Sequence, residues 1–122
     1  MPKSNRFHRI ENAWVGQKIL PKQIKRGVLI QIRDDYEKVD GMGVVTALKY
    51  RCPCGCKGVI DMPVKERPRW THDSPAHLVD FSSPSGPSVL PSIYSECGAH
   101  YFINKGDIIW VSEGVAVGAI NP

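Results

Sequence analysis

The four cysteines of this 122-residue chain restrict its fold more than any other feature, because they fall into two clusters far apart in the sequence. Three of them occupy the segment RCPCGCKG at residues 51–58, and the fourth opens the segment CGAH at residues 97–100. A separation of three, as in CGAH, is common for two ligands of one metal ion. The separations of two within the triplet are unusual, but Gly55 can adopt a backbone angle that lets the sulfurs converge. We therefore expect one ion to draw both segments to a common centre.

Five side chains are candidate ligands for the four positions around such an ion. They are Cys52, Cys54, Cys56, Cys97 and His100. A site of three cysteines and one histidine leaves out one cysteine of the triplet, whereas a site of four cysteines releases His100 for chemistry. Four protein ligands indicate a closed structural site, and three leave a position for water. Thiolate ligands favour zinc as the metal.

The chain lacks the motifs of two familiar classes of zinc enzyme. Residues 53–56, PCGC, are one residue short of the Pro-Cys-x-x-Cys motif of the zinc deaminases, and no His-x-Glu precedes them. The His-Glu-x-x-His pattern of zinc metalloproteases is absent as well. Neither activity is therefore expected of this chain.

Ten prolines and eleven glycines break the chain too often for long helices, so short strands and turns should dominate. The length suits one domain, and we expect residues 1–122 to form a single, mainly β domain of antiparallel hairpins with little helix, stapled by zinc. No apolar run reaches the ~20 residues of a membrane span, and the first residues do not resemble a signal peptide. We therefore expect a cytoplasmic protein without membrane contact, in which clustered thiols indicate metal ligands rather than disulfides.

Runs of β-branched and aromatic residues mark the expected strands. The residues after Pro21 resemble a single helical turn closed by Gly27, and Asn-Lys-Gly-Asp at 104–107 is typical of a hairpin turn. Residues 66–96 are rich in proline and serine, but they contain enough large apolar side chains to form an ordered loop. Strands are expected at residues 28–33, 44–52, 58–64 and 88–93, in a hairpin over 100–111, and at a sheet edge over 114–121. The cysteine triplet then lies at the tip of a hairpin.

The formal net charge of +4 is modest and is more typical of solvated surface than of a nucleic-acid site. Arg67, Arg69 and Trp70 form a basic and aromatic group of the kind that contacts single-stranded nucleic acid. Nucleic acid is nevertheless not an expected partner. The alternative to an enzyme is a non-enzymatic, zinc-ribbon-like module that binds a protein or a nucleic acid.

Several segments, in this order, resemble a bacterial family of small proteins of unknown function. Members of that family are encoded beside ubiquitin-like proteins and their activating-like and conjugating-like enzymes. The matching segments are LPKQIKRGVLIQI, CPCGCKG, Trp70, PSVLPSI and CGAHYFINKGDIIWV. The chain departs from the family pattern at Lys57, where a glycine is usual, and at Ala99, where a serine is usual. The segment between Trp70 and Pro87 is also longer.

The resemblance implies a zinc-bearing, β-rich peptidase that trims or removes ubiquitin-like modifiers, with a ubiquitin-like protein or its conjugate as the partner. Carried onto this chain, it implies Ser92 as nucleophile and His100 as base, with Ser88 and His77 as alternatives. A serine hydroxyl becomes a good nucleophile when a nearby base takes its proton, and histidine titrates near neutral pH. The nucleophile-elbow motif Gly-x-Ser-x-Gly does not occur. A binding module and hydrolysis at an open zinc site therefore remain as alternatives to a serine peptidase.

Overall fold

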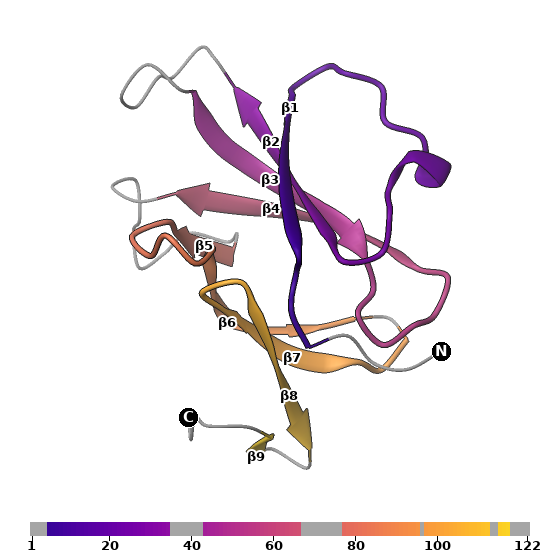
Figure 1. Cartoon of the computed structure of the whole chain (residues 1–122), viewed down its shortest axis with the longest axis vertical. Coiled ribbons are helices and arrows are strands. Elements are labelled where there is room, and N and C mark those ends of the chain that lie inside the picture. The colour runs from indigo at the N-terminus through magenta and orange to yellow at the C-terminus, as the bar shows by residue number, and fades with distance from the viewer. Residues whose placement is uncertain (1–4, 35–42, 67–76, 96, 113–114, 118–122) are drawn as a thin grey trace.

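The computed structural model describes residues 5–34, 43–66, 77–95, 97–112 and 115–117 (Figure 1). Within these residues the protein is almost entirely β, and the prediction of a mainly β fold with little helix is confirmed. No helix in the described part of the chain has the length and apolar character needed to cross a membrane. The elements are β1 (Arg9–Trp14), the 3-10 helix η1 (Pro21–Gln23), β2 (Val28–Asp34), β3 (Val44–Arg51), β4 (Val59–Glu66), β5 (His77–Asp80), β6 (Ser88–Tyr94), β7 (His100–Asn104), β8 (Asp107–Ser112) and β9 (Val115–Val117).

The strands form one nine-stranded sheet in which the spatial order follows the sequence order from β1 to β9. Six of the eight pairings are antiparallel, as hairpins require, but β1 pairs with β2 and β4 pairs with β5 in parallel. The sheet is therefore mixed, whereas the sequence suggested antiparallel hairpins throughout. Each parallel pair needs a crossover in place of a tight turn, and the chain between β1 and β2 supplies one in the loop that contains η1.

The sheet curls so that its β2–β4 half and its β6–β8 half face each other across the main core (Figure 1). Tyr50 of β3 and Tyr101 of β7 lie in this core, and their hydroxyl oxygens are 2.8 Å apart in a buried hydrogen bond. Burial raises the pKa of both phenols, that of Tyr101 to about 12. The bond satisfies two polar groups that would otherwise be costly inside an apolar core, and it joins the two halves of the sheet.

A second, smaller core lies on the other side of the β1–β2 edge. It contains the buried residues Ala13, Ile24, Val28, Ile30 and Ile32. β2 therefore contributes apolar side chains to both faces, and this explains its nearly continuous apolar sequence VLIQI. The loop with η1 contributes Ile24 and so covers the outer face of β2.

The expected strands over 28–33, 44–52, 58–64 and 88–93 and the hairpin over 100–111 correspond to β2, β3, β4, β6 and the β7–β8 pair. The helical turn after Pro21 is the 3-10 helix η1, and β9 forms the expected edge strand. β1 and β5 were not anticipated. Within the stretch expected to be a long loop, β5 is a strand of four residues that bonds to both β4 and β6.

Candidate active site and metal centre

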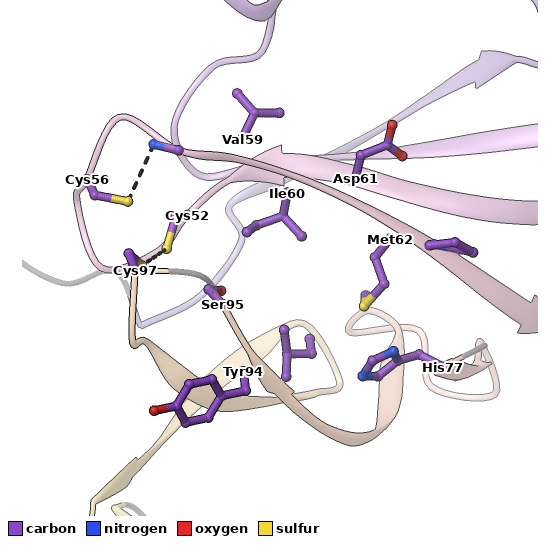
Figure 2. Close-up of a pocket in the computed structure, with 13 residues that line it drawn as sticks. Cys52, Cys56, Val59, Ile60, Asp61, Met62, His77, Tyr94, Ser95 and Cys97 are labelled. Atoms are coloured by element: carbon purple, nitrogen blue, oxygen red, sulfur yellow. Dashed lines mark hydrogen bonds between the residues drawn. The ribbon is translucent and has the colours of Figure 1, made fainter. Parts of the chain in front are cut away.

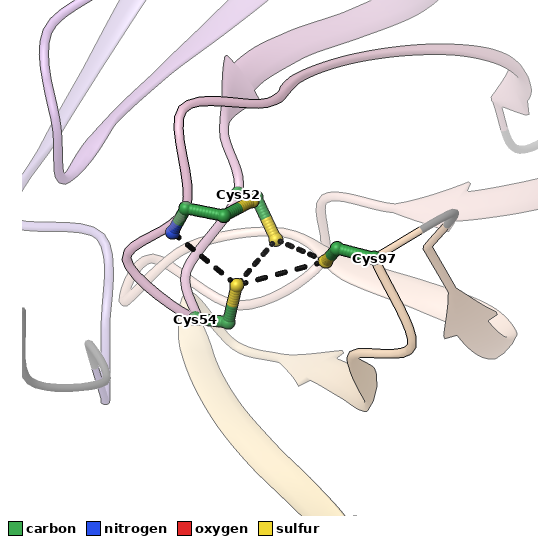
Figure 3. A group of neighbouring side chains, drawn as sticks. Cys52, Cys54 and Cys97 are labelled. Carbon is green, nitrogen blue, oxygen red and sulfur yellow. Dashed lines mark hydrogen bonds between the residues drawn. The ribbon is translucent and has the colours of Figure 1, made fainter.

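The four cysteines converge at one point, where the loop between β3 and β4 meets the turn between β6 and β7. Figure 3 shows three of them, Cys52, Cys54 and Cys97. All four sulfurs lie within 4.8 Å of one another. The Sγ atoms of Cys52, Cys54 and Cys97 form a triangle with separations of 3.4, 3.5 and 3.6 Å. Sulfurs bound at ~2.3 Å around a tetrahedral ion would be ~3.8 Å apart, so this donor set has the chemistry and the spacing to hold a metal ion. These residues are free thiols and form no disulfide.

The loop backbone turns sharply in order to aim the triplet inward. Gly55 has a positive φ of 97°, which a residue with a side chain rarely adopts, and its N–H donates to the carbonyl of Cys52. The Cys56 N–H donates to the Cys54 sulfur, and the Gly58 N–H donates to the Cys56 sulfur, each at 3.4 Å. The bond from Gly58 is the main reason that the pKa of Cys56 is lowered to about 7. The Gly58 amide therefore favours the thiolate form of Cys56.

The fourth sulfur is placed by a tight turn at the end of β6. The Ser95 N–H donates to the Ala99 carbonyl at 2.8 Å, and the Gly98 N–H donates to the Ser95 carbonyl at 2.9 Å. Gly98 has a positive φ of 90°. Cys97 on this turn is exposed, whereas Cys52 on the opposite loop is 1% exposed. An ion held here would tie a buried loop in one half of the sheet to a surface turn in the other.

His100, the fifth candidate ligand, is not a member of the sulfur cluster. Its Nε2 atom lies 2.9 Å from the Oγ atom of Ser92, and both side chains are partly buried. When Nε2 carries no proton, the Ser92 hydroxyl donates to it. The structure thus brings together a hydroxyl and an imidazole in the geometry that general-base activation of a serine requires.

The register of β6 and β7 produces this contact. Tyr94 lies directly opposite His100, and Ser92 is two residues further back on the same face, within diagonal reach of a long side chain. The ladder shifts register between Val89 and Ile93, so that four positions along β6 correspond to two along β7. Such bulges commonly redirect a side chain next to a functional site, and Ser92 lies within this one. The Tyr94 ring also packs against the His100 ring with centroids 5.2 Å apart.

The two alternative residues occupy different positions. The Ser88 hydroxyl accepts the Lys105 N–H at 3.0 Å and so supports the β7–β8 turn, and its own contact with Asn104 Oδ1 is 3.5 Å long. His77 lies near Ser92, but its Nε2–H donates to the Ser92 carbonyl at 3.3 Å rather than contacting the hydroxyl. In the part of the chain that the structure describes, neither Ser88 nor His77 forms a serine–histidine side-chain pair.

A groove of about 490 Å³ lies beside this site, between β4 and β6 (Figure 2). His77 lies at one end, and the sulfurs of Cys52, Cys56 and Cys97 lie at the other. Tyr94 and Ser95 line the β6 side. The groove therefore connects the sulfur cluster with the strand that carries Ser92.

Comparison with known proteins places the chain in a family. Residues 17–111 match the sequence model of the family described as bacterial ubiquitination-like system serine protease (BubE). The chain belongs to this family. The resemblance found in the sequence is thereby confirmed, and the BubE description links the chain to serine protease chemistry in a ubiquitination-like system. No match was found among curated proteins or among solved structures.

Two residues of the candidate site were not identified from the sequence, namely Tyr94 beside the imidazole and Ser95 in the groove. Ser95 is 6% exposed, and its hydroxyl has no hydrogen-bond partner within the described residues. The Tyr101 phenol is close enough for Ser95 to influence its pKa, but the two oxygens do not meet in hydrogen-bonding geometry. A sequence pattern gives no signal for such residues, because the place of Tyr94 beside His100 depends on the β6–β7 register and the place of Ser95 in the groove depends on β4 facing it. Arg67, Arg69 and Trp70, the expected surface of a binding module, lie outside the described residues.

Proposed function

We propose that this protein is a serine-type peptidase with a structural zinc ion, which processes or removes a ubiquitin-like modifier in a bacterial conjugation pathway. The observation that carries the proposal is the 2.9 Å contact between Ser92 Oγ and His100 Nε2, made by a histidine that is outside the sulfur cluster. Membership of the BubE family supports the same chemistry, because its description names a serine protease of a ubiquitination-like system.

In the proposed reaction the neutral imidazole of His100 accepts the Ser92 hydroxyl proton while the Ser92 oxygen bonds to the carbonyl carbon of the scissile bond. The protonated imidazole then donates its proton to the departing amine, and the acyl group stays on Ser92 as an ester. Water, activated by the same imidazole, hydrolyses that ester and restores the free serine. Tyr94 packs against His100 and limits the orientations of its ring.

The four cysteines would hold zinc as a closed structural ion, because four thiolates fill its tetrahedral coordination and leave no position for substrate. The role of the ion is then to fix the turn at Cys97, three residues before β7 begins with His100, which lies opposite Tyr94. Thiolate donors and the reducing cytoplasm that we expect for this chain both favour zinc over harder cations.

Covalent labelling tests the proposed nucleophile. Wild-type protein treated with a fluorophosphonate should gain one adduct, mapped by peptide mass spectrometry to Ser92, because only an activated serine reacts readily with this probe. Ser92→Ala should abolish the adduct and the cleavage of a ubiquitin-like protein that carries a C-terminal extension.

Ser88→Ala is the matched control, since it removes a hydroxyl from the same strand while leaving the pair with His100 intact. This variant should still label. Retention of cleavage in Ser92→Ala would remove Ser92 from the mechanism, and a wild-type protein that neither labels nor cleaves would favour the binding-module alternative.

A further inference from the structure

The groove beside Ser92 is bordered by two strand edges that have no partner within the described residues. β4 pairs with β3 along Val59–Pro63, and β5 covers its other edge only from Val64 onward. β5 likewise covers β6 only at Ser88–Leu90, and β7 pairs with the opposite edge of β6. β4 and β6 therefore both extend beyond the first residue of β5, at the same end of that strand, and there their facing edges are not covered by β5.

The β4 edge presents backbone groups to the groove. The Cys52 N–H donates to the Gly58 carbonyl, so the next residue, Val59, and then Asp61 point their backbone groups away from β3, following the alternation of an antiparallel ladder. Pro63 continues this series. A proline is tolerated in a strand where its missing N–H would face an edge, and its presence here agrees with this orientation.

The β6 edge does the same from the other side. The bond from the Ser95 N–H to the Ala99 carbonyl fixes the alternation, so that Tyr94 and Ser92 point their backbone groups away from β7 and toward the groove. The contact between His77 Nε2 and the Ser92 carbonyl confirms that this carbonyl lies on the groove side. Amide donors and carbonyl acceptors thus face each other across the groove.

The width of the groove follows from β5. β5 is bonded to both β4 and β6, so β4 and β6 lie two strand spacings apart, each of ~4.8 Å. Where β5 ends, the gap between β4 and β6 therefore has room for one extended chain. The floor is apolar, since Ile60, Met62 and Ile93 alternate toward the core. Figure 2 shows Asp61 and Met62 on the β4 side, with Tyr94 and Ser95 across from them.

We propose that this groove binds an extended segment of the substrate as an additional strand in line with β5, with small or apolar side chains toward the floor. Such strand addition obtains affinity from main-chain hydrogen bonds and selectivity from the pockets under alternate side chains. A segment bound there passes alongside Ser92. The inference deepens the proposed peptidase function by naming the form of its substrate, but the binding step itself requires no hydrolysis.

The test uses the full chain with Ser92→Ala, labelled with 15N, and a mixture of acetylated, amidated hexapeptides built from glycine, alanine, valine and leucine. The amide signals of Val59, Asp61 and Tyr94 should shift as the peptide concentration rises and should become protected from hydrogen exchange. Absence of any shift at these three amides would overturn the proposal. So would full protection before peptide is added, because the groove would then already be filled.

Asp61→Pro and Asp61→Ala form a matched pair on the same background. Both remove the surface ion pair between Asp61 and Lys49, but only proline removes the N–H that faces the groove, and neither disturbs the β3 ladder. Proline should weaken peptide binding about threefold to tenfold, as expected for one lost hydrogen bond, and alanine should stay within about twofold. Equal binding by the two variants would contradict the proposal. If Asp61→Pro does not fold, the amide shifts in the Ser92→Ala protein decide the question alone.

Failure of this inference and failure of the proposed function can be told apart. Peptide binding with no adduct on Ser92 in the wild-type protein would leave a strand-binding groove without peptidase chemistry. Labelling and cleavage without shifts at the groove amides would leave the peptidase with a different substrate path.

Discussion

The Nε2 atom of His100 lies 2.9 Å from the Oγ atom of Ser92. His100 is the first residue of β7 and follows Cys97, one of the four clustered cysteines, by three positions. One turn of the chain therefore serves two purposes. Its cysteine belongs to the sulfur cluster that could hold a metal ion, and its histidine contacts a serine of the neighbouring strand. If the ion holds the turn, it also holds the base, although neither the ion nor its ligands would take part in the reaction.

The first prediction separates the role of base from that of ligand. His100→Gln should slow fluorophosphonate labelling by about 10²–10⁴-fold, the usual contribution of general-base catalysis, because glutamine fills similar space without accepting the proton. The metal content should stay at that of the wild type, since His100 is outside the sulfur cluster. Inductively coupled plasma mass spectrometry on the same sample checks this. Loss of the metal together with labelling would identify His100 as a ligand.

Removal of the metal should loosen the fold rather than only the chemistry. The ion would join a loop of the β2–β4 half to a turn of the β6–β8 half, so chelation or Cys54→Ser should lower the melting temperature and also abolish Ser92 labelling. Near-ultraviolet circular dichroism with metal added back measures both effects. An apo-protein with unchanged melting behaviour that regains activity on addition of zinc would instead indicate an open catalytic site.

Zinc binding to the apo-protein should release protons and strengthen as pH rises. Burial raises the pKa of Cys52, and burial together with the Cys56 and Cys97 thiols raises that of Cys54 despite a bond from the Cys56 amide that lowers it. Both thiols are therefore protonated at pH 7 and must lose their protons when zinc binds. Cys56, with a pKa of about 7, adds a partial proton.

The measurement is titration calorimetry in buffers of different ionisation enthalpy. At pH 7 at least two protons should be released per zinc, and below pH 7, where Cys56 is also protonated, affinity should fall by more than about 100-fold for each unit of pH, approaching about 1,000-fold. Release of fewer than one proton would mean that the thiols are not the ligands.

The buried pair of Tyr50 and Tyr101 should show strongly non-additive mutational effects. Tyr101→Phe alone leaves the buried Tyr50 hydroxyl without its partner and should lower the free energy of unfolding by about 1–3 kcal/mol. The double variant with Tyr50→Phe should lose little more than either single variant, because no orphaned hydroxyl remains. Urea denaturation of the four proteins gives the coupling energy. Additive losses would show that the two hydroxyls do not depend on each other.

The sequence predicted most strands, because their β-branched runs are long and end at proline, glycine or asparagine. It missed β5, which has four residues in a stretch rich in proline and serine, and β1, most of whose side chains are exposed. Both strands form parallel pairs with a neighbour. A parallel partner has no hairpin turn to indicate it, so these pairings depend on contacts that local patterns do not record.

For the site, cysteine spacing was sufficient to predict that residues 52–56 and 97–100 meet, which the structure bears out for the four cysteines. It did not decide the position of His100, because a histidine three residues after a cysteine is typical of a zinc ligand, while the four cysteines could fill the site without it. That outcome depends on the register that sets His100 opposite Tyr94 and on the shifted ladder around Ser92. Such registers are a property of paired strands and are not visible in one strand alone.

The central claim is that the four sulfurs bind the metal and that His100 does not. X-ray absorption at the zinc edge, measured on purified, untagged protein, tests it most directly. Four sulfur atoms at ~2.3 Å and no nitrogen in the first coordination shell are predicted, with His100 left to Ser92. Three sulfurs and one nitrogen at ~2.0 Å would contradict this account.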